Sequence, residues 1–125
     1  MYEVMIEEEF SAAHALRGYR GKCENMHGHN WKVQVVVAGK TLDRNGLLCD
    51  FHVIERDIDA VIARFNNADL NATPPFDRIN PTAERVAEHI GEEVRRKLPA
   101  RVKMRRTTVS EAPGCKASFV PNDKS

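Results

Sequence analysis

Residues 27–38 read HGHNWKVQVVVA, and this stretch decides the kind of fold that the chain can adopt. Trp31 and three of the valines after it stand at every second position, which is the period of a strand with one buried face. Valine also favours strands, because its branched side chain packs well on a pleated surface. We therefore expect a strand over this whole stretch.

A second alternating stretch opens the chain. From Tyr2 to Phe10 apolar residues alternate with glutamates, which predicts a half-buried strand that ends near His14. The segment from Arg17 to Met26 carries Cys23 and is rich in glycine and basic residues, so we expect a loop there. The first two predicted elements are thus strands joined by a loop that holds a cysteine.

Two helices are expected after these strands. Asp50 is a suitable N-cap for the first, because apolar residues recur at three- or four-residue steps from Phe51 to Phe65. For the second, Asn80 is the expected cap and Pro81 the expected first helical residue, and Pro99 stops the apolar stripe. The same periodicity that predicts the helices also predicts which of their faces is buried.

The remaining segments complete the order of elements. Residues 66–79 hold two prolines and several Asn and Asp residues, which predicts a long loop between the helices. Residues 101–109 and 116–120 are expected to be a third and a fourth strand. The order is β-β-α-α-β-β in one domain, residues 1–125. The fold class is therefore α+β, with an antiparallel four-stranded sheet and two helices on one face.

Such a sheet leaves one face and both edges without cover. Lys32 and Gln34 provide little polar cover on the second strand, and Trp31 needs shelter. Association of several copies edge to edge, closing a barrel, would satisfy both needs.

The composition excludes several classes of function. Nineteen basic and eighteen acidic residues leave a formal net charge of +1, so no overall field attracts the protein to nucleic acid or to a membrane. The apolar runs are short, and the chain opens with Glu-rich sequence, so neither a membrane span nor a signal peptide is expected. Three cysteines without a C-x-x-C pair argue against a disulfide framework. We expect a cytoplasmic protein with reduced thiols.

Three histidines form the candidate site. His27 and His29 are two positions apart on the predicted strand and point to the same side, and His14 arrives from the neighbouring strand. Three imidazoles suit a catalytic Zn²⁺ ion, which keeps a fourth position open for water or substrate. The alternative is that Cys23 is a fourth ligand, which would make the zinc site structural.

These residues resemble the family of 6-pyruvoyl- and 6-carboxy-tetrahydropterin synthases, over nearly the whole chain. The resemblance implies the tunnelling fold, in which trimers close a twelve-stranded barrel and stack as hexamers. Three residues between Cys23 and His27 are typical of the bacterial 6-carboxy enzymes of queuosine biosynthesis. The matching segments are Phe10-Ser11-Ala12-Ala13-His14, Cys23 to His29, Asp50-Phe51, Leu70-Asn71, Pro81-Thr82 with Glu84, and Glu111.

The resemblance also implies a reaction and its residues. The enzymes convert 7,8-dihydroneopterin triphosphate to 6-carboxy-tetrahydropterin, acetaldehyde and triphosphate. Zinc on the three histidines would acidify the carbons of the substrate side chain. Cys23 is the candidate base, and Glu111 and Thr82 are candidate substrate-binding residues. The nearby cations Arg17, Arg20 and Lys22 suit the triphosphate.

One departure weakens the implied mechanism. Where the family usually has an Asp-His pair that moves protons with the cysteine, this chain has Asn66-Asn67. An amide orients a substrate or a water molecule but transfers no proton near neutral pH. Asp69, His52 and Glu24 are possible substitutes. The alternatives are a variant pterin reaction, either 6-pyruvoyl formation or aldol cleavage of the side chain, or a pterin-binding protein that has lost activity.

Overall fold

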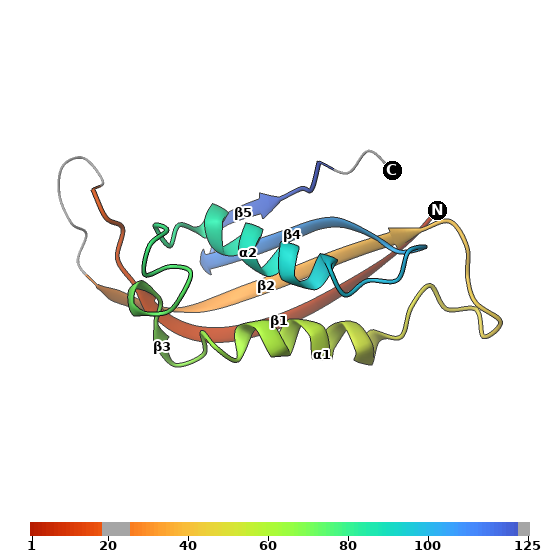
Figure 1. Cartoon of the computed structure of the whole chain (residues 1–125), viewed down its shortest axis with the longest axis horizontal. Coiled ribbons are helices and arrows are strands. Elements are labelled where there is room, and N and C mark those ends of the chain that lie inside the picture. The colour runs from red at the N-terminus through yellow and green to blue at the C-terminus, as the bar shows by residue number, and fades with distance from the viewer. Residues whose placement is uncertain (19–25, 123–125) are drawn as a thin grey trace.

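A computed structural model describes residues 1–18 and 26–122. Five strands form one sheet in the order β3-β1-β2-β4-β5 (Figure 1). The strand β3 is parallel to β1, and all other neighbours are antiparallel. The strands are β1 (Tyr2–His14), β2 (His27–Gly39), β3 (Ala68–Asp69), β4 (Lys103–Ala112) and β5 (Cys115–Phe119).

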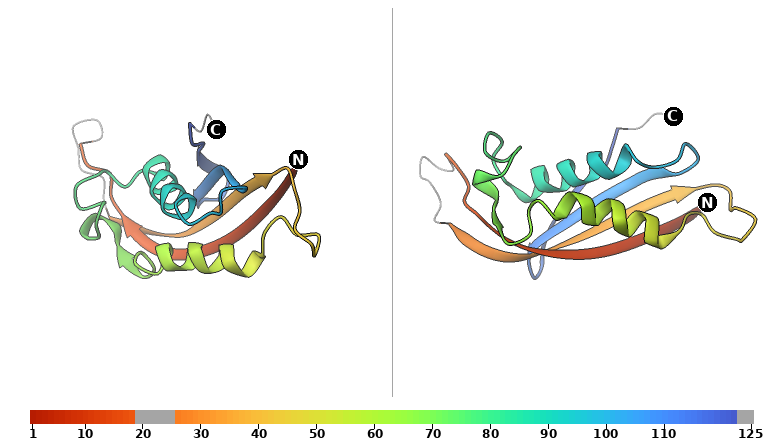
Figure 2. Two further views of the ribbon diagram at one scale, coloured as in Figure 1. Left: turned by 45° about the vertical axis from the view of Figure 1, so that its right-hand side comes forward. Right: turned by 60° about the horizontal axis from the view of Figure 1, so that its bottom comes forward.

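Two helices cover one face of the sheet. Helix α1 spans Phe51–Ile62 and packs along β1, and helix α2 spans Ala83–Arg95 and packs on β4 and β5. Figure 2 shows both helices on the same side of the curved sheet. The predicted class and order of elements are confirmed, and β3 is an addition within the segment 66–79 that was expected to be a loop. A short 3-10 helix, η1 (Leu70–Ala72), follows β3.

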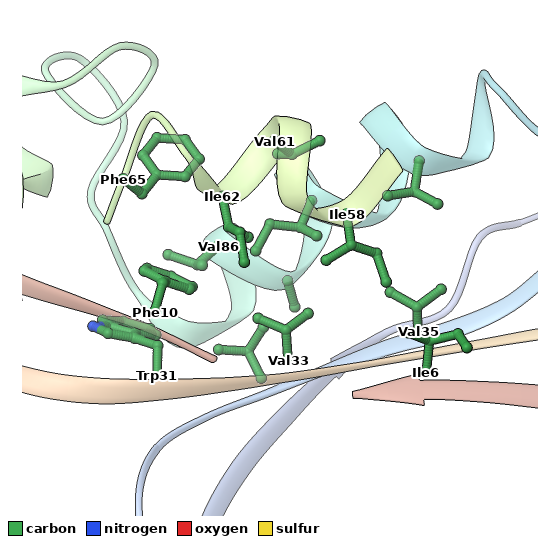
Figure 3. Packing of buried hydrophobic residues seen from close by; sticks show 14 of the residues in the cluster. Ile6, Phe10, Trp31, Val33, Val35, Ile58, Val61, Ile62, Phe65 and Val86 are labelled. Atoms are coloured by element: carbon green, nitrogen blue, oxygen red, sulfur yellow. The ribbon is translucent and has the colours of Figure 1, made fainter. Parts of the chain in front are cut away.

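The core lies between the sheet and the helices. Alternate residues of β1 and β2 point toward the helices, where Phe10 and Trp31 stack with ring centroids 5.8 Å apart (Figure 3). The facing stripe of α1 includes Ile54 and Ile58, which are fully buried. Full burial of one such side chain stabilises the fold by about 1.5–3 kcal/mol. The apolar residues at every second strand position and those on one face of each helix therefore form one buried layer.

The helix ends differ from those predicted. Helix α1 ends at Ile62 rather than Phe65, and the Phe65 ring still reaches the core from the following turn, where it is fully buried. The cap of α2 is Thr82, not Asn80, and the Thr82 side chain accepts a hydrogen bond from the Arg85 amide. Asn80 is not the cap because its side-chain amide binds the backbone of Arg17.

Helix α2 approaches the sheet closely at Gly91. A Cβ atom at this position would lie 2.8 Å from the Thr107 hydroxyl oxygen and 2.9 Å from the Phe119 ring. Only glycine allows this contact without displacing β4 or β5. Neither this helix nor any other in the described part of the chain has the length and apolar character needed to cross a membrane.

Candidate metal centre

The structure brings the three predicted histidines together. In the register of β1 and β2, His14 lies opposite His27, and Ala12 lies opposite His29. All three rings point toward the helix-covered face, and one ligand nitrogen from each lies within 4.8 Å of the others. The predicted clustering is thus confirmed by the pairing of two strands. Among the described residues, these histidines form the group suited to holding a metal ion.

His14 is held in one orientation. Its ring is 2% exposed, and Nδ1 lies 2.8 Å from the carbonyl oxygen of Pro81. A carbonyl oxygen only accepts hydrogen bonds, so Nδ1 carries the proton and donates it. In the neutral ring Nε2 then presents a lone pair. Metal-binding histidines typically have such a partner on the other nitrogen, because it fixes both the tautomer and the ring orientation.

Glu111 lies beside Nε2 of His14, an atom that is buried. Its Oε2 atom is 3.1 Å from His14 Nε2, although the two groups do not have the alignment of a hydrogen bond. Glu111 stands where the β4–β5 register shifts between Ser110 and Ala112. Val109 faces the core, and Glu111 is two residues further along β4, so the alternation of the strand places its carboxylate on the same side of the sheet as the histidines. The side chain is 32% exposed, so it also reaches a cavity.

That cavity has a volume of about 740 Å³ and runs over the sheet face that the helices leave open. Glu111 and His29 are at one end of it, and the β4–β5 turn at Pro113 borders it. The cavity therefore adjoins both the Glu111 carboxylate and a residue of the histidine cluster. Other lining residues are Glu7, Glu9, Lys32, Gln34, Thr108 and Lys116.

The donor set fits zinc. Three imidazole nitrogens match the ligands of catalytic zinc sites, and imidazole is a preferred ligand of this ion. On one side the centre is bounded by Trp31, whose ring centroid is 4.8 Å from that of His14. Trp31 is fully buried and donates its indole N–H to the Ala12 carbonyl oxygen. This wall excludes water from one side of the histidines.

Asparagine side chains hold the end of β1 that carries His14. The Asn71 amide accepts a hydrogen bond from the Ala15 N–H and donates one to the Ala15 carbonyl, both at 2.8 Å. The Asn80 amide does the same for Arg17, at 2.8 and 3.3 Å. Each side-chain amide thus makes the two hydrogen bonds that the backbone of a neighbouring strand would otherwise make. Sequence reasoning did not find these roles, although Leu70-Asn71 belonged to the resemblance.

The Asn66-Asn67 pair continues this arrangement. The Asn66 side chain accepts a hydrogen bond from the Ser11 N–H at 3.0 Å, and the Asn67 N–H donates to the Ser11 carbonyl. Asn67 adopts a φ of 60°, in the left-handed region that asparagine tolerates better than most residues. Its side chain lines a cavity of about 590 Å³ together with His29 and Asp69. Asn66 is therefore a structural residue, whereas Asn67 faces space that a ligand can enter.

Two of the possible substitutes for a proton-transfer group have structural contacts. Asp69 accepts a hydrogen bond from the Asn71 N–H and borders the cavity beside Asn67. His52 stands at the start of α1, the opposite end of that helix from β3, and its ring pairs with Glu55 at 3.0 Å (Figure 1). His52 is thus far from the centre and is not a candidate. Of the substitutes that lie in the described part of the chain, Asp69 is the one that borders the cavity beside His29.

Arg17 supports the loop between the helices. Its guanidinium is half-buried and donates to the carbonyl oxygens of Asn71 and Phe76, and its contact with a triphosphate stays a prediction. Thr82 caps α2 directly after the carbonyl that orients His14. The predicted positions at Cys23, Arg20, Lys22 and Glu24 lie outside the described residues.

Comparisons with known proteins identify the family to which the chain is similar. A family model described as 6-pyruvoyl tetrahydropterin synthase matches residues 3–122. The 6-carboxy-5,6,7,8-tetrahydropterin synthase of Bacillus subtilis strain 168 is 32% identical over 124 residues, covering 95% of this chain and 77% of that protein. The dihydroneopterin monophosphate aldolase of Pyrococcus furiosus is 32% identical over 108 residues, covering 86% of this chain and 88% of that protein.

A solved structure shows the same fold. The 6-pyruvoyl tetrahydropterin synthase of Caenorhabditis elegans aligns with a TM-score of 0.82 over 98% of each chain. The two sequences are 24% identical, so this likeness speaks for the fold alone.

Proposed function

The chain belongs to the 6-pyruvoyl tetrahydropterin synthase family, whose tunnelling fold it shares, and from this we propose that it is a zinc-dependent 6-carboxy-5,6,7,8-tetrahydropterin synthase. Its substrate would be 7,8-dihydroneopterin triphosphate, and its products 6-carboxy-tetrahydropterin, acetaldehyde and triphosphate. The reaction would serve queuosine biosynthesis. The identity to the Bacillus subtilis enzyme supports the choice of this reaction within the family.

The observation that carries the proposal is the arrangement of His14, His27 and His29. Their ligand nitrogens converge within 4.8 Å, and the Pro81 carbonyl binds Nδ1 of His14, which leaves Nε2 available as a ligand atom. A bound zinc ion would polarise the hydroxyl oxygens of the substrate side chain and so acidify the adjoining carbons. Three protein ligands leave room for such oxygens, as in other catalytic zinc sites.

The chain's own residues would divide the remaining work. The Glu111 carboxylate offers two acceptor oxygens to the N–H groups of a pterin ring in the adjoining cavity. Cys23 is the proposed base, because a thiolate near a cation has a lowered pKa and can accept a carbon-bound proton. Thr82 has a hydroxyl that is still able to donate while its oxygen caps α2, and it is a further proposed substrate contact.

A second candidate is aldol cleavage of the pterin side chain. The identity to the Pyrococcus furiosus aldolase supports it, and so does the amide at Asn67. An amide cannot relay protons, so a route that needs fewer proton transfers suits this chain better. The substrate would then be dihydroneopterin monophosphate or a related ester, and the pterin product would keep a one-carbon alcohol side chain.

We further propose a homo-hexamer of two barrel-forming trimers in the cytoplasm. Among the described residues, β1 pairs only with β2 from Tyr2 to Phe10, so this stretch offers an edge for a second copy. The odd count of three cysteines is consistent with a compartment that keeps thiols reduced.

The test is a product assay with zinc-loaded protein. Dihydroneopterin triphosphate and monophosphate are supplied separately, and the pterin products are identified by mass spectrometry. The 6-carboxy product with acetaldehyde supports the leading proposal, and a hydroxymethyl pterin supports the aldolase. The matched control is His27→Ala, which removes one ligand from a half-buried position and should abolish either activity.

Absence of turnover, together with tight pterin binding, would contradict both enzyme proposals. In that outcome the protein binds pterins without converting them. Cys23→Ala separates the roles of the sulfur, because loss of activity with full zinc content indicates a base. Loss of zinc in the same variant indicates a ligand.

A further inference from the structure

We propose that Glu111 is a displaceable fourth ligand of the metal centre, which closes the open position before substrate arrives. The carboxylate is not a member of the three-histidine cluster, yet it stands beside the one nitrogen whose lone-pair character is fixed. This inference gives Glu111 a function that needs no pterin. Its release by substrate, by contrast, rests on the proposed function.

The two facing atoms, His14 Nε2 and Glu111 Oε2, are both electron-pair donors. The Pro81 carbonyl requires the proton of His14 on Nδ1, so Nε2 of the neutral ring is an electron-pair donor. An ionised carboxylate oxygen is also only an electron-pair donor. Two such atoms 3.1 Å apart in a buried site repel one another unless a cation lies between them. A metal ion bound by both atoms would be such a cation.

The distance between His14 Nε2 and Glu111 Oε2 is similar to that between two ligands of one metal ion. Two ligands bonded to a tetrahedral zinc ion at about 2.0–2.2 Å are separated by about 3.3–3.6 Å. The His14–Glu111 separation of 3.1 Å is close to this range. The two groups also lack the alignment of a hydrogen bond, which a proton between them would favour. A shared metal ion therefore accounts for the contact better than an ion pair does.

The Glu111 side chain lies between the histidines and the cavity. Glu111 stands at the register shift of the β4–β5 hairpin, and bulges commonly re-aim a side chain beside an active site. One-third of the side chain is exposed, and it lines the cavity of about 740 Å³. The carboxylate can therefore turn from the metal to a ligand in the cavity without any change in the backbone. The N–H donors of a pterin would supply the alternative partner.

The experiment measures metal binding without pterin. Zinc affinity is determined by competition with a chromophoric chelator, and Co²⁺ replaces zinc to report coordination through its visible absorption. Glu111→Gln should lower zinc affinity at least about tenfold, since an anionic ligand is replaced by a weak neutral one. The Co²⁺ form of this variant should also bind imidazole about tenfold more tightly, because the fourth position is no longer occupied.

Two further variants separate ligation from charge. Glu9→Gln removes one carboxylate from the same cavity, on the opposite face of β1 from His14, and should change neither affinity. Glu111→Asp keeps the charge but shortens the side chain by one carbon. If reach is essential, this variant should resemble Glu111→Gln. Imidazole is a neutral probe, so its binding is insensitive to the charge lost in these variants. Circular dichroism and Tm confirm that each variant is folded.

Three results would overturn the inference. One is equal zinc affinity in Glu111→Gln and Glu9→Gln, which would make Glu111 only an ion-pair partner of His14. Another is full retention of affinity in Glu111→Asp. The third is a thiolate-to-cobalt charge-transfer band that disappears in Cys23→Ser, because sulfur would then hold the fourth position. Failure of pterin turnover with the Glu111 effects intact would contradict the proposed function alone.

Discussion

The segment Tyr2–Arg17, which comprises β1 and the three residues after it, has two halves that are held in different ways. The packed half, Tyr2–Phe10, is fixed by alternate apolar side chains that enter the core under α1. The amide-held half, Ser11–Arg17, is fixed along its outer edge by β3 and by the side chains of Asn66, Asn71 and Asn80. Packing tolerates small displacements, whereas paired hydrogen bonds fix a backbone position closely. The half that carries His14 is the one held by directional contacts.

The largest effect is expected from breaking the packed half. Ile6 is 7% exposed, and Ile6→Ala should lower the free energy of unfolding by about 2–4 kcal/mol through lost burial and a residual cavity. Denaturant unfolding measures this loss. Zinc affinity of the folded variant should remain within about twofold of wild type, because Ile6 has no contact with the centre. A large loss of affinity would show that the two halves are not separable.

Breaking the amide-held half should cost less stability but should weaken zinc binding. Asn71→Ala removes two hydrogen bonds to Ala15 and should cost about 1–3 kcal/mol of stability. Zinc affinity should fall about 10–100-fold, because the backbone next to His14 loses its support. Asn80→Ala, which acts three residues from His14, should have a smaller effect on zinc. Equal effects on zinc from both variants would contradict this graded expectation.

The two helix caps offer a sharper comparison. Asp50→Ala and Thr82→Ala each remove an N-cap and should cost about 1 kcal/mol of stability. Thr82 follows the carbonyl that orients His14, so only its variant should also weaken zinc binding, by a few fold. Thermal unfolding and chelator competition measure the two quantities. Weaker zinc binding in Asp50→Ala would show that the difference is not local.

The smallest effect concerns Glu8, a carboxylate of the packed half that faces α1. Burial raises the pKa of Glu8 above its ordinary value, and the nearby Asp59 and Glu55 raise it further. A raised folded-state pKa stabilises the fold only at low pH, and this contribution is lost as pH rises through that pKa. Glu8→Gln should therefore raise Tm at pH 7 by on the order of 2–4 °C. The gain should disappear in scans near pH 4.

Sequence reasoning was most successful where one local rule decides the outcome. The alternation after Trp31 predicted β2, and the spacing of His27 and His29 predicted that both rings share a face. The register of β1 and β2 then explains why His14 joins them. These features depend on the period of a strand, which a single sequence displays directly.

The sequence was less informative where one side chain has several possible partners. Asn80 before Pro81 resembles a helix cap, but its amide binds Arg17, 63 residues away in the chain. Asn66 looked like a replacement for a proton-transfer residue, but its oxygen completes the edge beside Ser11. Asparagine suits caps, turns and strand edges equally well, so tertiary contacts decide its role.

The amides along Ser11–Arg17 have a consequence for self-assembly. A bare strand border acts as a template on which another chain can grow, and here that template is already occupied by side chains of the same molecule. Any subunit that extends the sheet through β1 must therefore stop before Ser11. Such a contact would use the backbone of Tyr2–Phe10, whereas His14 stands beyond it, at the end of the strand.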